Sequence, residues 1–454
     1  MTNAIEALKE ARGAHLERLM EWLRIPSVST DPAHKGDVRR AGEFIRDELG
    51  SSGFDVAMTE TPGHPIVTAN WTKAPGKPTL LVYGHYDVQP PDPLDLWRHG
   101  PFEPTLEGSN LVARGATDDK GQCFALVRGI SGMLQAEGSL PVNVKFLIEG
   151  EEEIGSPNLE NYIRANADAL AADVVLISDT SQWAPGVPAL TVSLRGLVYL
   201  QVNLVGPNRD LHSGSFGGSV ENPGHALCQM MSALKDANGR ITIPGFYDDV
   251  RELSDDERAA MRALPFDEEE YRKDLDVPEL VGEKGYSAIE HKASRPTLDI
   301  NGLLTGWTGE GAKTVLPSKA MAKFSMRLVP NQDPDKIRAA AMAHLEKLVP
   351  PGVKMTIDTC HDGAPIEVAT DSPWVAGAQR AIEKGFGTAP VFIREGGSIP
   401  VVSTFKEVLG LDTILLGLGL PDDNTHSPNE KFNVDDFQRG IETVAHFLNE
   451  MAEA

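Results

Sequence analysis

Short apolar runs recur in the first and last parts of the chain, and each one gives way abruptly to polar residues. Four such runs occupy residues 80–83, 142–148, 174–178 and 413–416. Runs of this length are typical of strands that are buried within an α/β sheet. The stretches between them, such as residues 122–137, have the length and composition of helices. We therefore predict an α/β domain built from both ends of the chain.

The middle of the chain has a different pattern, in which apolar and polar residues alternate strictly. Apolar side chains occupy every second position of residues 198–204 and again of residues 322–328, as in a sheet with one face on a core and the other open. The expected elements follow the order β-α-β-β-α-β, with helices over residues 222–238 and 334–348, which is the ferredoxin-like order. An acidic segment with several prolines, which we call the excursion, occupies residues 239–294.

These two patterns predict an α/β protein of two domains, the second inserted into the first. Residues 1–188 and 373–454 would form a discontinuous domain with a mixed sheet, and residues 189–372 an inserted ferredoxin-like α+β domain. A chain of 454 residues is too long for a single core.

Charge and cysteine content narrow the classes of partner. The chain carries 42 basic and 66 acidic residues, a net charge of -24, which repels phosphate backbones and anionic membranes. We therefore expect neither a nucleic acid nor a membrane as partner, and no apolar run approaches the length of a membrane span. The three scattered cysteines and an N-terminal amphipathic helix in place of a signal peptide favour a cytoplasmic location.

The strand ends and the loops beside them carry residues that commonly bind metals. This set comprises two imidazoles and three carboxylates: His85, Asp118, Glu153, Asp179 and His426. Such a set suits two divalent ions bridged by one carboxylate, whereas the alternative is a group of solvated loop charges. Asp87 follows His85 by two positions and would orient its ring.

Three consecutive glutamates, residues 151–153, closely follow the strand predicted at residues 142–148. Three adjacent like charges repel one another, and a cation is the simplest group to stabilise them at that place. One glutamate can bind metal while a neighbour takes a proton from a water bound by the metal. This division of roles predicts metal-assisted hydrolysis.

Several motifs together resemble the dinuclear zinc aminoacylase/carnosinase metallopeptidases, and most closely their cytosolic nonspecific dipeptidase branch. They are GHYDVQP, RGATDDKGQ, EGEEEIGS, LISDT, DLHSGSFGGS, GAKTVLPSKA, FSMRLVP, REGGSIP and NTHSPNE. The similarity extends from about residue 14 to residue 450, with a looser match at residues 246–290 that leaves substrate preference open. The resemblance implies a di-metal catalytic domain and an inserted lid and dimerisation domain.

The resemblance also implies a role for each matching residue. One metal would be held by His85 and Asp179 and the other by Glu153 and His426, with Asp118 bridging them. Glu152 would be the general base, Asp87 would orient His85, and the Asp118–Asp119 peptide would be cis. His212 would contact the scissile carbonyl from the partner subunit of a homodimer. The remaining substrate contacts would be Thr314, Arg327, His361 and Ser398.

Arg327 is the one substrate contact with independent support, because strand alternation places it on the open face of its sheet. A guanidinium there can bind a carboxylate bidentately, although a surface salt bridge is the alternative. We therefore predict a homodimeric metallodipeptidase that cleaves peptides with a free C-terminal carboxylate. An N-acyl-amino-acid deacylase and a non-catalytic binding protein are the alternatives. Zinc is the expected metal, but the ligand set also suits manganese or cobalt.

Overall fold

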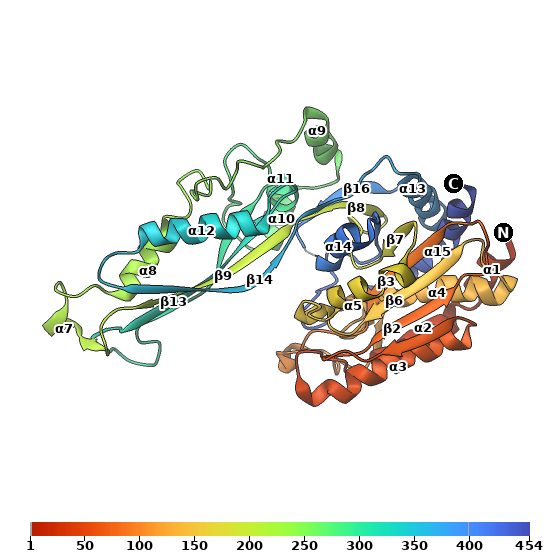
Figure 1. Ribbon diagram of the computed structural model, residues 1–454, viewed down its shortest axis with the longest axis horizontal. Coiled ribbons are helices and arrows are strands. Elements are labelled where there is room, and N and C mark those ends of the chain that lie inside the picture. The colour runs from red at the N-terminus through yellow and green to blue at the C-terminus, as the bar shows by residue number, and fades with distance from the viewer. Residues whose placement is uncertain (1, 398) are drawn as a thin grey trace. The chain divides into compact units, whose positions relative to one another are not determined.

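The computed structural model describes residues 2–397 and 399–454, and of Thr2, Asn3 and His361 only the backbone. The chain divides into two compact units, which Figure 1 shows as ribbons. The first unit comprises Met1–Val192, Val368–Ile393 and Val401–Ala454, and the second Ser193–Glu367 and Arg394–Pro400. Among the described residues, no helix combines the length and the apolar character that crossing a membrane requires.

The first unit contains most of a nine-stranded mixed sheet. Its strands follow the order β1-β2-β6-β3-β7-β17-β8-β15, and β16 also pairs with β8. Their bounds are β1 (Asp55–Thr59), β2 (Ile66–Trp71), β3 (Thr79–His85), β6 (Asn143–Glu149), β7 (Val174–Ile177), β8 (Ala189–Leu194), β15 (Ile366–Glu367), β16 (Val391–Glu395) and β17 (Thr413–Gly417). The four predicted apolar runs lie in β3, β6, β7 and β17.

Parallel pairing at the centre of this sheet places several strand ends together. β3 is parallel to both β6 and β7, and β17 is parallel to β7. The carboxyl ends of these four strands therefore meet at one edge, where open α/β sheets bind ligands. A smaller sheet consists of β4 (Thr105–Glu107), β5 (Asn110–Val112) and β18 (Lys431–Asn433).

Helices pack around the nine-stranded sheet. They are α1 (Thr2–Glu10), α2 (Arg12–Leu23), α3 (Lys35–Ser51), α4 (Lys120–Glu137), α5 (Leu159–Ala165), α6 (Ala167–Leu170), α13 (Pro373–Phe386), α14 (Pro400–Thr404) and α15 (Val434–Glu453). α4 approaches β3 so closely that a Cβ at Gly84 would lie 2.6 Å from the Cys123 sulfur and 3.0 Å from Asp119 Oδ2. Glycine at position 84 thus brings the start of α4 beside the end of β3.

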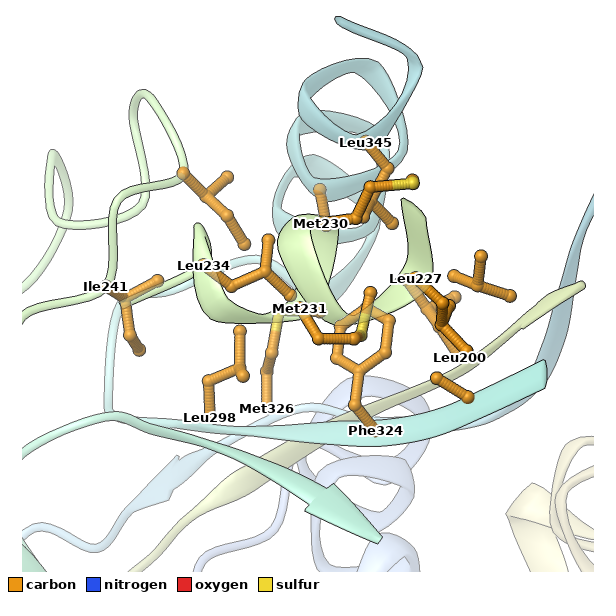
Figure 2. Close-up of a cluster of buried hydrophobic side chains, with 14 of the residues drawn as sticks. Leu200, Leu227, Met230, Met231, Leu234, Ile241, Leu298, Phe324, Met326 and Leu345 are labelled. Carbon is orange, nitrogen blue, oxygen red and sulfur yellow. The ribbon is translucent and has the colours of Figure 1, made fainter. Parts of the chain in front are cut away.

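The second unit contains a four-stranded antiparallel sheet in the order β11-β13-β9-β14. Its strands are β9 (Gly196–Val205), β11 (Thr297–Thr305), β13 (Lys319–Leu328) and β14 (Lys354–Gly363), and the helices α8 (Pro223–Ser232) and α12 (Pro334–Leu348) complete the β-α-β-β-α-β order. Figure 2 shows apolar side chains of both helices meeting those of the sheet in one core. The predicted ferredoxin-like insertion is confirmed.

One helix of the second unit is shorter than the sequence predicts, and a segment for which no elements were predicted contains three helices. The helix predicted over residues 222–238 ends at Ser232, because Asp236 instead accepts the backbone N–H groups of Asn238 and Arg240 and closes a turn. The excursion at residues 239–294 contains regular structure, in the helices α9 (Asp255–Ala263), α10 (Glu268–Asp274) and α11 (Ala288–Ala293). The short elements α7 (Ser213–Phe216), β10 (Leu211–His212) and β12 (Val315–Leu316) complete the unit.

Candidate metal centre

The five predicted metal ligands lie together at the carboxyl edge of the central strands. His85 is the last residue of β3, and Asp179 follows β7 by two residues. Glu153 lies in the short 3-10 helix η3 (Glu152–Ile154), just after β6. Asp118 precedes α4, and His426 belongs to the loop after β17. The structure thus brings together all five residues that the sequence analysis singled out.

Asp118 lies between two groups of candidate ligands. Its Oδ1 is 3.3 Å from His85 Nε2, and that nitrogen is 3.9 Å from Asp179 Oδ2. Its Oδ2 is 2.9 Å from His426 Nε2, and that nitrogen is 3.3 Å from Glu153 Oε2. Each group of three offers ligand atoms within 4.8 Å of one another. One carboxylate with an oxygen in each group has the arrangement of a bridging ligand.

The backbone beside Asp118 and His426 is unusual in both places. The Asp118–Asp119 peptide is cis, which confirms the expectation from the resemblance. His426 has a φ of 61°, in the left-handed region that non-glycine residues seldom adopt. A neighbouring backbone bond from the Ser427 N–H to the Asn424 carbonyl, at 2.9 Å, helps to hold this loop.

The electrostatics of the cluster suit bound cations. His85 Nε2 is buried and makes no hydrogen bond among the described residues. Burial, followed by the charge of Asp118, raises the pKa of Asp179 well above its usual range. Hydrogen bonds to Asp118 and Glu153 raise the pKa of His426 to about 10. The shifted pKa values show that these side chains compete for protons in the absence of a cation. Imidazole nitrogens and carboxylate oxygens are also the ligands that divalent ions such as zinc bind.

Asp87 connects the first histidine to the glutamates. Its Oδ1 is 3.4 Å from His85 Nδ1, while its backbone carbonyl is 3.1 Å from the same nitrogen. The Asp87 carboxylate also accepts the backbone N–H groups of Glu152 at 3.3 Å and Glu153 at 3.1 Å. Asp87 therefore orients the His85 ring through its carbonyl and its carboxylate, and the carboxylate also fixes the turn that carries both glutamates.

The three adjacent glutamates have different surroundings. Glu151 is buried and accepts hydrogen bonds from the His64 backbone at 3.0 Å and from the Asn158 amide at 2.8 Å. Glu153 faces His426 and accepts a hydrogen bond from the Gln89 amide at 2.8 Å. Burial, reinforced by the charges of Glu153 and Asp118, raises the pKa of Glu152 to about 8. Glu152 is thus suited to exchange a proton near neutral pH.

Two further carboxylates support the site, and the sequence pattern alone does not predict a role for either of them. Glu430 is fully buried and accepts backbone N–H groups of Gly115, Thr117 and Asp118 at 2.9 to 3.1 Å, and Arg114 Nη1 at 2.7 Å. Asp119 Oδ2 accepts the His85 backbone N–H at 3.1 Å. Their only sequence signals were membership of the NTHSPNE and RGATDDKGQ motifs.

The predicted substrate contacts belong to the second unit. His212 and Thr314 come together there, because β10 pairs with β12 and the Ser213 N–H donates to the Thr314 carbonyl at 3.1 Å. The His212 side chain is exposed and accepts the Gly214 N–H at 3.0 Å. Arg327 lies in β13, between the core residues Met326 and Leu328, and is half-buried. Ser398 and the side chain of His361 lie outside the described structure.

Comparison with known proteins gives matches over nearly the whole chain. The family described as "Peptidase family M20/M25/M40" matches residues 81–450. The Cys-Gly metallodipeptidase dug1 of Schizosaccharomyces pombe is 34% identical over 463 residues, with 98% of this chain and 97% of that protein covered. The Beta-Ala-His dipeptidase of Homo sapiens is 33% identical over 456 residues, with 96% and 90% covered.

A solved structure supports the same architecture. The M20 family metallo-carboxypeptidase Sso-CP2 from Sulfolobus solfataricus is 36% identical to this chain and superimposes with a TM-score of 0.88. The match covers 97% of this chain and 99% of that one. Both units of the fold therefore have counterparts in the solved structure of Sso-CP2.

Proposed function

The chain belongs to peptidase family M20/M25/M40, and from this premise we propose that it is a metallodipeptidase that cleaves short peptides with a free C-terminal carboxylate. The observation that carries the proposal is the position of Asp118 between two groups of candidate metal ligands, with Glu152 adjacent to one of those ligands in the chain. Dipeptide cleavage is also the activity in the names of two relatives that cover almost the whole chain.

We assign the ligands according to the two groups. His85 and Asp179 would hold one ion, Glu153 and His426 the other, and Asp118 would bridge them. Two bound divalent ions, zinc in our proposal, would polarise the scissile carbonyl and lower the pKa of the attacking water. Manganese and cobalt suit the same donors.

Glu152 would carry out the proton transfers of the reaction. The Glu152 carboxylate takes a proton from the attacking water and returns it to the leaving amine nitrogen. Burial and the neighbouring carboxylates raise the pKa of Glu152 to about 8 in the metal-free chain, so its carboxylate can accept a proton and hold it until the amine leaves. Asp87 supports this step by fixing the backbone of Glu152 and the ring of His85. Arg327 would bind the free carboxylate of the substrate through its guanidinium.

Rates on four substrates separate this function from its nearest alternative, an N-acyl-amino-acid deacylase. We expect the purified enzyme with added zinc or manganese to hydrolyse Ala-Ala and Cys-Gly much faster than N-acetyl or N-succinyl amino acids. A preference for the acylated amino acids would overturn the dipeptidase assignment. Absence of turnover on all four substrates would favour a non-catalytic binding protein.

We also propose a homodimer in which His212 of the second unit completes the active site of the partner subunit. His212 is exposed, whereas the two candidate metal-binding groups found among the described residues lie in the first unit. Thr314, His361 and Ser398 would contact substrate, as the resemblance implies. A cytoplasmic location is proposed from the three cysteines, Cys123, Cys228 and Cys360, which are all free.

A further inference from the structure

The excursion at residues 239–294 is anchored firmly within the second unit. Arg295, whose side chain is 2% exposed, is 2.9 Å from Glu283 and 3.2 Å from Glu252. Its guanidinium also lies 4.1 Å from the centre of the Tyr286 ring. Charged side chains that are this deeply paired hold a fixed geometry. The acidic excursion is therefore an ordered part of the unit.

One end of this excursion is connected by ion pairs to the strand β16. Glu257, in α9, is 2.8 Å from Arg251 and 3.0 Å from Arg394. Glu367 is 2.8 Å from Arg394 and 3.1 Å from Arg251. We call these four residues the Arg394 cluster. Hydrogen bonds from Arg251 lower the pKa of Glu257 to about 2, so this carboxylate is charged at neutral pH.

Arg394 leads directly into a turn that contacts another arginine. The Arg195 backbone N–H donates to the Glu395 carbonyl at 3.2 Å, and a Cβ at Gly396 would overlap the Arg195 guanidinium. Arg195 Nη1 also donates to the His291 carbonyl of α11 at 3.3 Å. The excursion therefore reaches this turn by two routes, through Glu257 and through His291.

Arg195 lies close to the arginine that we propose as the carboxylate clamp. Two residues after Arg195, Leu197 pairs with Arg327 across β9 and β13. Burial, followed by the positive charge of Arg327, lowers the pKa of Arg195 to about 10. Two guanidinium groups near each other attract a carboxylate more strongly than either one alone.

From these contacts we propose that Glu257 is a positioning residue for substrate binding. Through Arg394 it holds the turn at residues 395–397 against Arg195 and so maintains the pair of cations, Arg195 and Arg327, that receives the free carboxylate of the substrate. This inference rests on the proposed function for the identity of the ligand. It gives the excursion a part in determining substrate affinity.

The chain offers a closely matched control for this role. Glu257 and Glu290 each occupy the third position of a helix in a capping box, with Ser254 and Ser287 respectively. Each also pairs with an arginine, since Arg258 Nε is 2.5 Å from Glu290. Glutamine retains the capping function and removes the charge in both places. Of these two glutamates, Glu257 contacts Arg394, whereas Glu290 pairs with Arg258.

The test combines hydrogen exchange with steady-state kinetics. In Glu257→Gln we expect faster exchange of the backbone amides of residues 394–397 and a KM for Ala-Ala raised about five-fold, with kcat within about two-fold of wild type. Glu290→Gln should leave both measurements at wild-type values, because glutamine keeps the capping box of α11 and so the His291 carbonyl that Arg195 contacts. In an Arg394→Gln background, Glu257→Gln should add no further change, because the two residues act through one contact.

Unchanged exchange at residues 394–397 in Glu257→Gln, or an equal increase in Glu290→Gln, would overturn the proposal. If Glu257→Gln does not fold, Arg394→Lys replaces it with the same expectations, since a lysine cannot span both carboxylates in the planar geometry of arginine. A wild-type enzyme without peptidase activity would refute the proposed function instead, and the exchange result would still decide whether Glu257 holds the turn.

Discussion

At the scale of single residues, three neighbouring glutamates acquire three tasks from their surroundings. Glu151 accepts hydrogen bonds from the backbone of His64 and the side chain of Asn158. Glu153 faces His426, whereas the pKa of Glu152 is raised to about 8. Identical side chains in consecutive positions thus differ because the turn after β6 points them to different partners. Charge content alone could not assign these tasks.

Substitution of each glutamate by glutamine should give three distinct results. Glu152→Gln should lower kcat by about 10²- to 10⁴-fold with near wild-type metal content, because it removes a proton carrier. Glu153→Gln should lose metal and activity together. Glu151→Gln should mainly destabilise the fold, by about 1–3 kcal/mol, because a buried hydrogen-bonded carboxylate is replaced.

Metal analysis, steady-state rates and urea unfolding of the three variants, measured side by side, test this division. Equal metal loss in Glu152→Gln and Glu153→Gln would contradict the separation of base from ligand.

At the scale of elements, the site depends on how closely α4 approaches β3. The start of α4 presents Asp118 and Asp119 to the end of β3, where Asp119 accepts the His85 backbone N–H. Glycine at position 84 permits this approach, since any Cβ there would lie 2.6 Å from the Cys123 sulfur. Strand and helix packing therefore determines the geometry of the ligands.

Two glycine-to-alanine substitutions should have different effects on stability. Gly84→Ala should destabilise the protein by about 1–3 kcal/mol because the new methyl group overpacks the interface of α4 and β3. Gly13→Ala should be neutral or stabilise the protein by up to about 1 kcal/mol, because Gly13 is inside α2 with no atom within 4 Å of the new Cβ. Urea unfolding measures both, and a Gly84→Ala variant as stable as wild type would contradict the packing argument.

The elements that the sequence predicted well are those whose pattern is local. The apolar runs of β3, β6 and β7 and the alternation of β9 and β13 are visible within a few residues. The apolar runs also placed His85, Glu153 and Asp179 at or just after strand ends. The role of Glu430 was not predictable in this way, since its partners at residues 114–118 are more than 300 positions away in the chain. The helix predicted over residues 222–238 was too long because the side chain of Asp236 competes for the backbone.

At the scale of the whole molecule, we propose that two subunits together complete each active site. The candidate metal ligands belong to the first unit and His212 to the second. A symmetric dimer in which each second unit serves the partner's site would bring them together. The alternative is that His212 contributes to the active site of its own subunit.

Mixing two inactive variants distinguishes these arrangements. Glu152→Ala and His212→Ala chains, mixed in equal amounts and allowed to exchange, should recover roughly a quarter of wild-type activity, because half the dimers are mixed and each mixed dimer has one intact site of two. Fluorescence energy transfer between labelled chains would verify the exchange. No recovery after verified exchange would place His212 in its own subunit's site or outside catalysis.

Zinc titration of metal-depleted protein, followed by the rate of Ala-Ala hydrolysis, tests the two-metal peptidase most directly. We expect negligible activity without metal and a rise to a plateau at two equivalents of zinc per chain, because Asp118 bridges two groups of ligands. Full activity in the metal-depleted protein, or a plateau at one equivalent, would contradict the account.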